Sequence, residues 1–164
     1  MATGGLFLRK LRARVAHEPT GFVWVENDRV AASGYPASKG QLRWLVGQGI
    51  NSVLTLTRDP LPADWTQGLP LELGHIAMED HQVPDVATLD RGAEYLSARL
   101  KEGKTVLVHC LAGEGRTGCV LAAYLIKEEQ LGPLEALKRL REVKATFVER
   151  DQEKAVMEYG AAIR

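Results

Sequence analysis

The sequence predicts a single α/β domain, on three observations. Short β-branched or apolar runs alternate with longer stretches of helical periodicity. The chain has 164 residues, which is the length of one domain and not of two lobes. Apolar residues make up 45% of it and charged residues 26%, an ordinary globular composition that excludes disorder of the whole chain. We therefore expect one folded domain over residues 21–164, preceded by a basic extension over residues 1–20.

The first half of the domain contains strand, helix and loop signals in turn. Residues 22–25 and 29–32 are predicted to pair as a hairpin, because a polar turn separates two short apolar runs. A helix is expected to start near Ser38, whose hydroxyl can cap the first turn. Residues 51–56 have the apolar character of a buried strand, and the proline-rich residues 58–70 predict a loop.

The second half alternates in the same way and ends in helices. Residues 71–76 predict a strand, and residues 85–100 predict a helix with one apolar face. Residues 105–108 are the apolar core of a further strand, buried on both faces. From about Thr117 the chain is predicted to be helical, with breaks at a Gly-Pro pair and around residues 143–149.

Charge and cysteine content exclude several classes of protein. Lysine plus arginine and aspartate plus glutamate both total 21, so the formal net charge is zero. The chain as a whole then has no field that attracts nucleic acid or anionic lipid, and no apolar run approaches the roughly 20 residues of a membrane span. Two cysteines are too few for a disulfide framework or a four-thiolate zinc site. We expect a cytoplasmic protein that binds neither nucleic acid nor membrane.

The extension is the exception to this even charge distribution. Arg9, Lys10, Arg12 and Arg14 alternate with apolar residues, as in a short amphipathic helix. Such a helix could dock on a membrane surface or a partner. The favoured interpretation is a solvated helix that packs on the body or frays.

The most informative stretch follows the strand at residues 105–108. The strand runs into a glycine-containing turn over residues 109–118, and a helix follows. At such a junction, unpaired backbone N–H groups and the positive end of the helix dipole bind anions. Cys110 and Arg116 stand at the two ends of a loop that can fold into a cup, and Arg116 can hold two oxygens of a phosphoryl group. The residues between them, which we expect to bind substrate together with Arg116, are Leu111, Ala112, Gly113, Glu114 and Gly115.

The same cup activates the thiol. Positive charge and a helix N-terminus favour the thiolate, so Cys110 is expected to be ionised at neutral pH and to attack phosphorus in line. Residues 113–118 also match the glycine fingerprint of dinucleotide-binding folds, but the strand and acidic residue that should follow are replaced by helices. An inert buried cysteine would explain neither the glycines nor Arg116. Nucleophilic catalysis is the favoured interpretation.

The run from His109-Cys110 to Arg116-Thr117 resembles the signature of the cysteine-dependent protein tyrosine phosphatase superfamily. The short chain and the stretch over residues 152–156 are most similar to the small atypical dual-specificity phosphatases, including compact archaeal members. The resemblance extends over about residues 22–163. It implies a central mixed, largely parallel sheet flanked by helices, no metal or cofactor, and hydrolysis of phosphotyrosine, phosphoserine or phosphothreonine.

The resemblance also implies a general acid about thirty residues before the cysteine. Asp80 has this spacing and follows a predicted strand, so it is the preferred candidate. Asp85 stands in a Pro-Asp dipeptide that looks more like the family's motif, but it lies at the expected start of a helix, where a cap is needed. We expect Asp80 to donate the proton and Asp85 to cap the helix.

Four further roles are implied by the same resemblance. The Thr117 hydroxyl would stabilise the leaving thiolate, and His109 would support the loop without acting as a base. Gln152 would orient the attacking water, or else it would lie on the exposed side of the last helix. Some relatives support the signature arginine with a glutamate; here Asp59 could replace that glutamate, or Arg116 could be held differently.

Two residues near the signature carry expectations of their own. Glu114 would place a negative charge at the mouth of the pocket and disfavour polyanionic inositol lipids. Cys119 is predicted to be a small packed residue, with a protective disulfide as the alternative.

The favoured function is a monomeric enzyme that acts on phosphorylated proteins or peptides. A module that binds phosphorylated partners without turnover is the second hypothesis. An RNA 5′-phosphate or a small phosphorylated metabolite is the third possible kind of ligand.

Overall fold

Five short strands form the centre of the computed structural model, which describes residues 17–164. They are β1 (Val23–Glu26), β2 (Val30–Ser33), β3 (Ser52–Thr55), β4 (Glu72–His75) and β5 (Val106–His109). The strand order is β1-β2-β5-β3-β4, with β1 antiparallel to β2 and every other pair parallel. The expectation of a mixed, largely parallel sheet is therefore confirmed.

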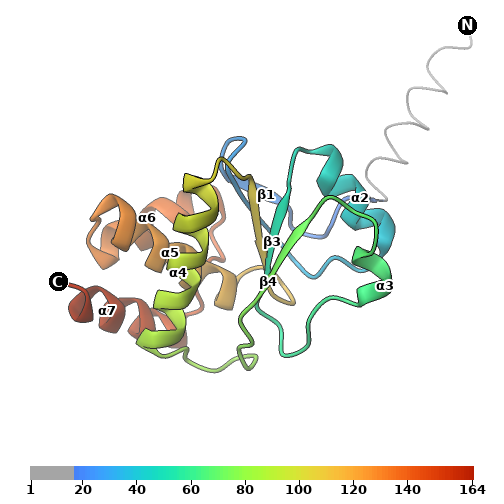
Figure 1. Cartoon of the computed structure of the whole chain (residues 1–164). Coiled ribbons are helices and arrows are strands. Elements are labelled where there is room, and N and C mark those ends of the chain that lie inside the picture. The colour runs from blue at the N-terminus through green and yellow to red at the C-terminus, as the bar shows by residue number, and fades with distance from the viewer. Residues whose placement is uncertain (1–16) are drawn as a thin grey trace, which may run out of the picture.

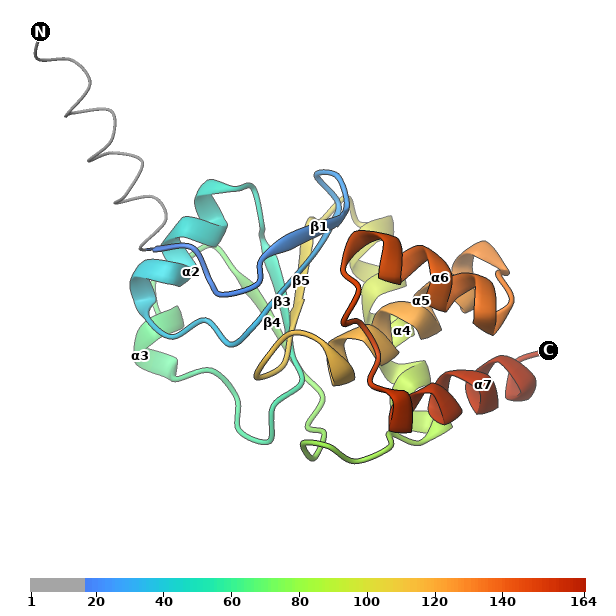
Figure 2. The same ribbon diagram turned by 180° about the vertical axis from the view of Figure 1, so that it is seen from behind.

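Helices cover both faces of this sheet. They are α2 (Lys39–Gly47), α3 (Ala63–Thr66), α4 (Val86–Lys101), α5 (Gly115–Glu129), α6 (Pro133–Val143) and α7 (Glu153–Ala162), with a short 3-10 helix, η1 (Arg150–Gln152), directly before α7. Figures 1 and 2 show α2 and α3 on one side of the sheet and α4 to α7 on the other. The predicted α/β layering is thus present.

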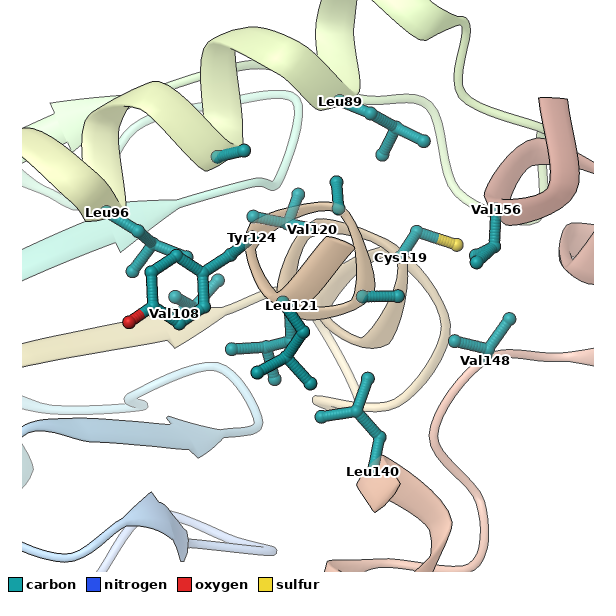
Figure 3. Packing of buried hydrophobic residues seen from close by; sticks show 14 of the residues in the cluster. Leu89, Leu96, Val108, Cys119, Val120, Leu121, Tyr124, Leu140, Val148 and Val156 are labelled. Carbon is teal, nitrogen blue, oxygen red and sulfur yellow. The ribbon is translucent and has the colours of Figure 1, made fainter. Parts of the chain in front are cut away.

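The central strand β5 supplies both hydrophobic cores. Val106 and Val108 face the core under α4 to α7, whereas Leu107 faces the smaller core under α2. This alternation follows from the two-residue period of a strand and explains why all three residues are apolar. In Figure 3, α5 lies at the centre of the larger core, with side chains of α4, α6 and α7 around it. The helix that follows the anion-binding turn is therefore packed on all sides.

Most element boundaries agree with the sequence prediction. Ser38 caps α2 by accepting from the Gln41 backbone N–H at 3.2 Å. One correction concerns the loop predicted over residues 58–70, which contains α3, a single helical turn too short to show periodicity. A second is the start of α5, which begins at Gly115, two residues before the predicted Thr117.

The predicted amphipathic segment lies outside the described residues, because the structure describes the chain from His17 onward. Among residues 17–164, no helix combines the length and the apolar character required to cross a bilayer.

The sheet brings three strand ends together at one edge. Ser33 at the end of β2 and Thr55 at the end of β3 both lie in register with His109 at the end of β5. Ligands of open α/β sheets bind outside the carboxyl ends of parallel strands. The turn after β5 lies at this edge and is the place to look for a site.

Candidate active site

The loop between β5 and α5 is a cup with the Cys110 sulfur at its floor. Cys110 follows β5 directly and is 2% exposed. The Gly113 backbone N–H donates to its Sγ at 3.3 Å. Because α5 begins at Gly115, the unpaired N–H groups of its first turn and its dipole lie next to this loop. The arrangement stabilises negative charge, both on the sulfur and on a bound anion.

Contacts with β2 and with the segment after α6 fix the shape of the loop. Gly113 has φ +74°, and a Cβ there would lie 2.4 Å from the Ser33 carbonyl group, so only glycine fits. The Tyr35 backbone N–H donates to the Leu111 carbonyl at 2.9 Å, and Lys144 Nζ donates to the Gly113 carbonyl at 3.3 Å. The loop is therefore held in place by both flanking segments.

Arg116 is held by groups other than the one the sequence suggested. It lies in the first turn of α5 and is 4% exposed. Its Nη1 donates to the Met78 carbonyl at 2.9 Å, and its Nη2 pairs with Asp80 Oδ1 at 2.9 Å. Asp59 is exposed, and within residues 17–164 its carboxylate forms no ion pair. The expectation that Asp59 supports Arg116 is therefore corrected. The other alternative agrees with the geometry, because the Met78 carbonyl and Asp80 hold the guanidinium.

The two candidate acids occupy different places. Asp80 lies at the hollow above Cys110 and faces Arg116. Asp85 caps α4, where its carboxylate accepts from the Thr88 backbone N–H at 2.7 Å. Hydrogen bonding to Thr88 lowers the pKa of Asp85 below its ordinary value of 3.8, so this group stays ionised at neutral pH. The structure brings Asp80, and not Asp85, to the nucleophile.

His109 has a neutral, buried ring, and both of its nitrogens are hydrogen-bonded. Its Nδ1 lies 3.1 Å from the Cys110 carbonyl, and its Nε2 lies 2.8 Å from Thr55 Oγ1. A carbonyl only accepts, so Nδ1 carries the hydrogen and Nε2 accepts from the Thr55 hydroxyl. Burial lowers the pKa of His109 to about 4. The ring therefore positions the Cys110 backbone and has no free lone pair with which to act as a base.

Thr117 and Gln152 are both buried beside the loop. Thr117 Oγ1 has no hydrogen-bond partner among the described residues, so its hydroxyl is available to another group. Gln152 is 1% exposed, and its Nε2 donates to the Gln82 carbonyl at 3.3 Å. The alternative that Gln152 lies on the exposed side of the last helix is therefore wrong. Gly115 makes room for it, since a Cβ at Gly115 would lie 2.4 Å from Gln152 Oε1.

Cys110, Arg116, Asp80 and Gln152 line a hollow of about 110 Å³. It is far smaller than the roughly 300–1,000 Å³ of a typical small-molecule site, so it admits a group of phosphoryl size while the rest of a substrate stays outside. The residues that line it are Asp80, His81, Cys110, Leu111, Ala112, Gly115, Arg116, Glu149 and Gln152.

Two loop residues predicted to bind substrate do not line the hollow. Gly113 contributes its N–H to the sulfur. The Glu114 side chain lines an adjoining groove, where Lys144 Nζ lies 4.0 Å from its Oε1. The expectation of Glu114 at the pocket mouth is thus corrected, because the loop turns its side chain away from the sulfur. Glu149 also lines the hollow and was not predicted. It lies 39 residues after Cys110, and no motif surrounds it in the sequence.

Cys119 belongs to the hydrophobic core. Figure 3 shows its sulfur among the side chains under α5, near Val156. Burial raises the pKa of the Cys119 thiol to about 12. Both cysteines are free thiols in the structure. This environment favours the packed residue over the redox partner.

Comparison with known proteins shows which family the chain resembles. The family model described as Swiss Army Knife protein, DSP-PTPase phosphatase domain (PTP-SAK) matches residues 19–158. Mouse dual specificity protein phosphatase 12 is 36% identical over 110 residues, which are 66% of this chain and 31% of that protein. Phosphatidylglycerophosphate phosphatase PTPMT1 from Arabidopsis thaliana is 28% identical over 143 residues, 80% of this chain and 42% of that protein.

A solved structure extends the match to the fold. Tk-PTP in its active form has a TM-score of 0.76 at 30% identity and covers 85% of this chain and 96% of that one. The chain spans only part of the curated relatives it matches. It covers 57% of the length of an uncharacterized protein of Methanocaldococcus jannaschii, 29% of rat dual specificity protein phosphatase 12 and 42% of the Arabidopsis enzyme. With a family model that matches nearly the whole described chain, this protein belongs to the cysteine-based protein tyrosine phosphatases, among the small atypical dual-specificity phosphatases.

Proposed function

We propose that this chain is a protein phosphatase that hydrolyses phosphotyrosine, phosphoserine and phosphothreonine monoesters through a phosphocysteine intermediate. The observation that carries the proposal is the placement of Cys110, Arg116 and Asp80 around one phosphoryl-sized hollow. A nucleophile, an anion-binding guanidinium and a carboxyl group are the three parts that such a reaction needs.

In the first step, the Cys110 thiolate attacks phosphorus in line with the ester oxygen. The S–P bond forms as the P–O bond to the leaving group breaks, and Asp80, in its protonated form, gives its proton to the departing oxygen. Arg116 and the N–H groups of the loop meet the charge on the equatorial oxygens. The products are phosphocysteine and the free alcohol or phenol.

In the second step, water attacks the phosphocysteine. Asp80, now a carboxylate, takes a proton from the water as the P–O bond forms and the S–P bond breaks. The Thr117 hydroxyl, which has no other partner among the described residues, would donate to the leaving sulfur. Gln152 lines the hollow and would orient the water with its amide. Inorganic phosphate leaves and the thiolate is restored.

Charges around the hollow favour a protein substrate over an anionic lipid. A groove of about 370 Å³ adjoins the hollow along Tyr35 and Arg58, and it can take the organic part of the ester. The exposed acids along the hollow and this groove are Asp59, Glu79 and Glu149, and the exposed bases there are Arg58 and His81. A surface with excess acid is repelled by a membrane of anionic lipid.

The test of the mechanism is metal-free hydrolysis of p-nitrophenyl phosphate. Purified protein should release phosphate in the presence of a chelator, and Cys110→Ser should abolish turnover. Rapid acid quench of the wild type with a labelled substrate should trap phosphate on Cys110. Turnover by Cys110→Ser at the wild-type rate would exclude the intermediate, and tight phosphopeptide binding without phosphate release would favour a binding module.

The test of the substrate class compares soluble phosphopeptides with lipids. We expect kcat/KM for phosphotyrosine and phosphoserine peptides to exceed that for phosphatidylglycerophosphate in vesicles by at least about tenfold. Faster hydrolysis of the lipid, which is the substrate class in the name of the Arabidopsis relative, would overturn this assignment.

Asp80 and Asp85 can be separated by the leaving group. Asp80→Ala should lower kcat on the order of 10²-fold for a peptide phosphoserine, whose alkoxide is a poor leaving group, and less for p-nitrophenyl phosphate. Asp85→Ala should leave this dependence on the leaving group unchanged. Equal effects of the two substitutions would contradict the assignment of the acid.

A further inference from the structure

The imidazole of His81 lies between two carboxylates at the mouth of the hollow. His81 Nδ1 lies 3.5 Å from Glu149 Oε2, and His81 Nε2 lies 3.6 Å from Asp80 Oδ2. The His81 backbone N–H also donates to Asp80 Oδ1 at 3.0 Å. The loop after β4 is thereby joined to the segment before α7. The chemistry described above uses neither His81 nor Glu149.

We propose that Glu149 is a positioning residue that acts through His81 to hold the loop of Asp80 over the Cys110 sulfur. This inference rests on the proposed role of Asp80 as the proton donor. It assigns Glu149 no contact with the reacting atoms. Its effect is on where the Asp80 carboxyl group lies when the ester bond breaks.

The need for such a tie follows from the contacts of Arg116. In the structure, Asp80 is held at the hollow by its ion pair with Arg116, at 2.9 Å. A substrate phosphoryl group requires the same guanidinium donors and carries more negative charge, so it displaces the carboxylate. The side-chain ties that then remain between this loop and the segment before α7 are His81 to Glu149 and Gln152 to the Gln82 carbonyl.

The segment that carries Glu149 is firmly anchored, as a positioning group requires. Val148, the residue before it, has φ +63°, a strained value for a β-branched side chain. Its backbone N–H donates to the Glu114 carbonyl at 3.2 Å, and Arg141 donates to the carbonyls of Phe147 and Val148 at 3.2 and 2.9 Å. These bonds tie the segment to the catalytic loop and to α6. Glu149 is therefore the fixed side of the contact and the Asp80 loop the adjustable side.

A double-mutant cycle with Asp80 tests whether Glu149 acts through it. In the wild-type background, Glu149→Gln should lower kcat for a phosphoserine peptide about 3- to 5-fold, the scale of an exposed charged pair, with little change in KM. In the Asp80→Asn background, the same substitution should have no further effect. An equal loss in both backgrounds, or no loss in the wild type, would overturn the proposal.

Two further variants make the comparison specific. Asp151→Asn removes a negative charge from an exposed side chain of η1, two residues from Glu149, and should leave kcat unchanged. His81 has φ +57°, which asparagine also tolerates, so His81→Asn removes the ring and keeps the backbone. It should reproduce the loss caused by Glu149→Gln, and the two together should cost no more than either alone. Additive losses would exclude the bridge.

Amide hydrogen exchange tests the tie without any turnover. All three proteins are measured with phosphate bound. Peptides that cover residues 79–84 should exchange faster in Glu149→Gln than in the wild type or in Asp151→Asn. Unchanged exchange would overturn the positioning role. Because this measurement needs no substrate hydrolysis, it separates failure of the tie from failure of the proposed phosphatase activity, which wild-type turnover of p-nitrophenyl phosphate tests independently.

Discussion

The charge of His109 links the active site to stability. Its folded-state pKa is about 4, below the ordinary value of 6.5, so the unfolded chain takes up this proton first as the pH falls. Well above pH 6.5 the ring is neutral in both states and contributes no pH dependence. Between those two values, the group should lower the free energy of unfolding by up to about 1.4 kcal/mol per pH unit, and below them the loss should level off.

Two measurements check this expectation. An NMR titration should show the His109 ring still neutral at pH 5, and urea unfolding should show a smaller slope with pH in His109→Asn than in the wild type. A titration midpoint near 6.5 would mean that the ring is not buried as described. It would also reopen the possibility that His109 takes part in proton transfer.

The two cysteines should differ sharply in reactivity. Burial raises the pKa of Cys119 to about 12, so at neutral pH its thiol is both protonated and inaccessible. Iodoacetamide at pH 7 should label Cys110 first, with vanadate as a protecting ligand, and should label Cys119 only after denaturation. Peptide mapping by mass spectrometry measures both sites. Labelling of Cys119 in the folded protein at the rate of Cys110 would contradict its place in the core.

At the scale of the elements, the catalytic loop depends on one glycine. Gly113 combines φ +74° with a close approach to Ser33. Gly113→Ala would add both a left-handed strain and a backbone overlap, so we expect a loss of about 2–4 kcal/mol in unfolding free energy or a loop that rearranges. A rearranged loop should abolish phosphate release.

Gly103 provides the matched control for this substitution. It has a similar φ of +77°, but no atom lies within 4 Å of a Cβ placed there. Gly103→Ala should cost only the backbone strain, about 1 kcal/mol, and leave turnover unchanged. Equal losses at the two glycines would show that the contact with β2 contributes nothing.

Local chemistry explains which elements could be predicted from the sequence. Ser38 and Asp85 were recognisable as caps because a cap and the N–H that it accepts are three residues apart. Helix α3 has only four residues, too few for an apolar period, and was missed. Cys110 and Arg116 were predictable because the signature loop contains both of them.

The parts of the site that could not be predicted come from distant segments. His81 and Glu149 are 68 residues apart, and no motif contains both. The burial of Gln152 likewise depends on the path of the chain after α6, which is set by Val148 and its left-handed backbone. Pairings of this kind need the tertiary fold, because neither composition nor periodicity encodes them.

At the scale of the whole molecule, a polar contact joins three helices away from the hollow. Asp90 of α4 accepts from Lys127 of α5 at 2.8 Å and from the Tyr159 hydroxyl of α7 at 2.7 Å. The hydrogen bond from Lys127 lowers the pKa of Asp90 below 3.8, so this stabilisation is present above that pH and is lost as the pH falls through the lower, folded-state value.

Tyr159→Phe should remove one of these bonds without changing the packing. We expect the free energy of unfolding to fall by about 1 kcal/mol, with kcat unchanged, because no atom of this contact lies at the hollow. Urea denaturation and steady-state kinetics on the same preparation check the two halves. A change in kcat would mean that the position of α7 reaches the active site through η1.

The ion pair between Arg116 and Asp80 gives the anion-binding guanidinium a counter-ion from its own chain. An anion that binds Arg116 Nη2 must compete with this half-exposed carboxylate. A dianionic phosphate monoester is attracted to the guanidinium more strongly than chloride or a carboxylate metabolite with a single charge. We therefore expect the ion pair to weaken the binding of monoanions more than that of phosphate esters.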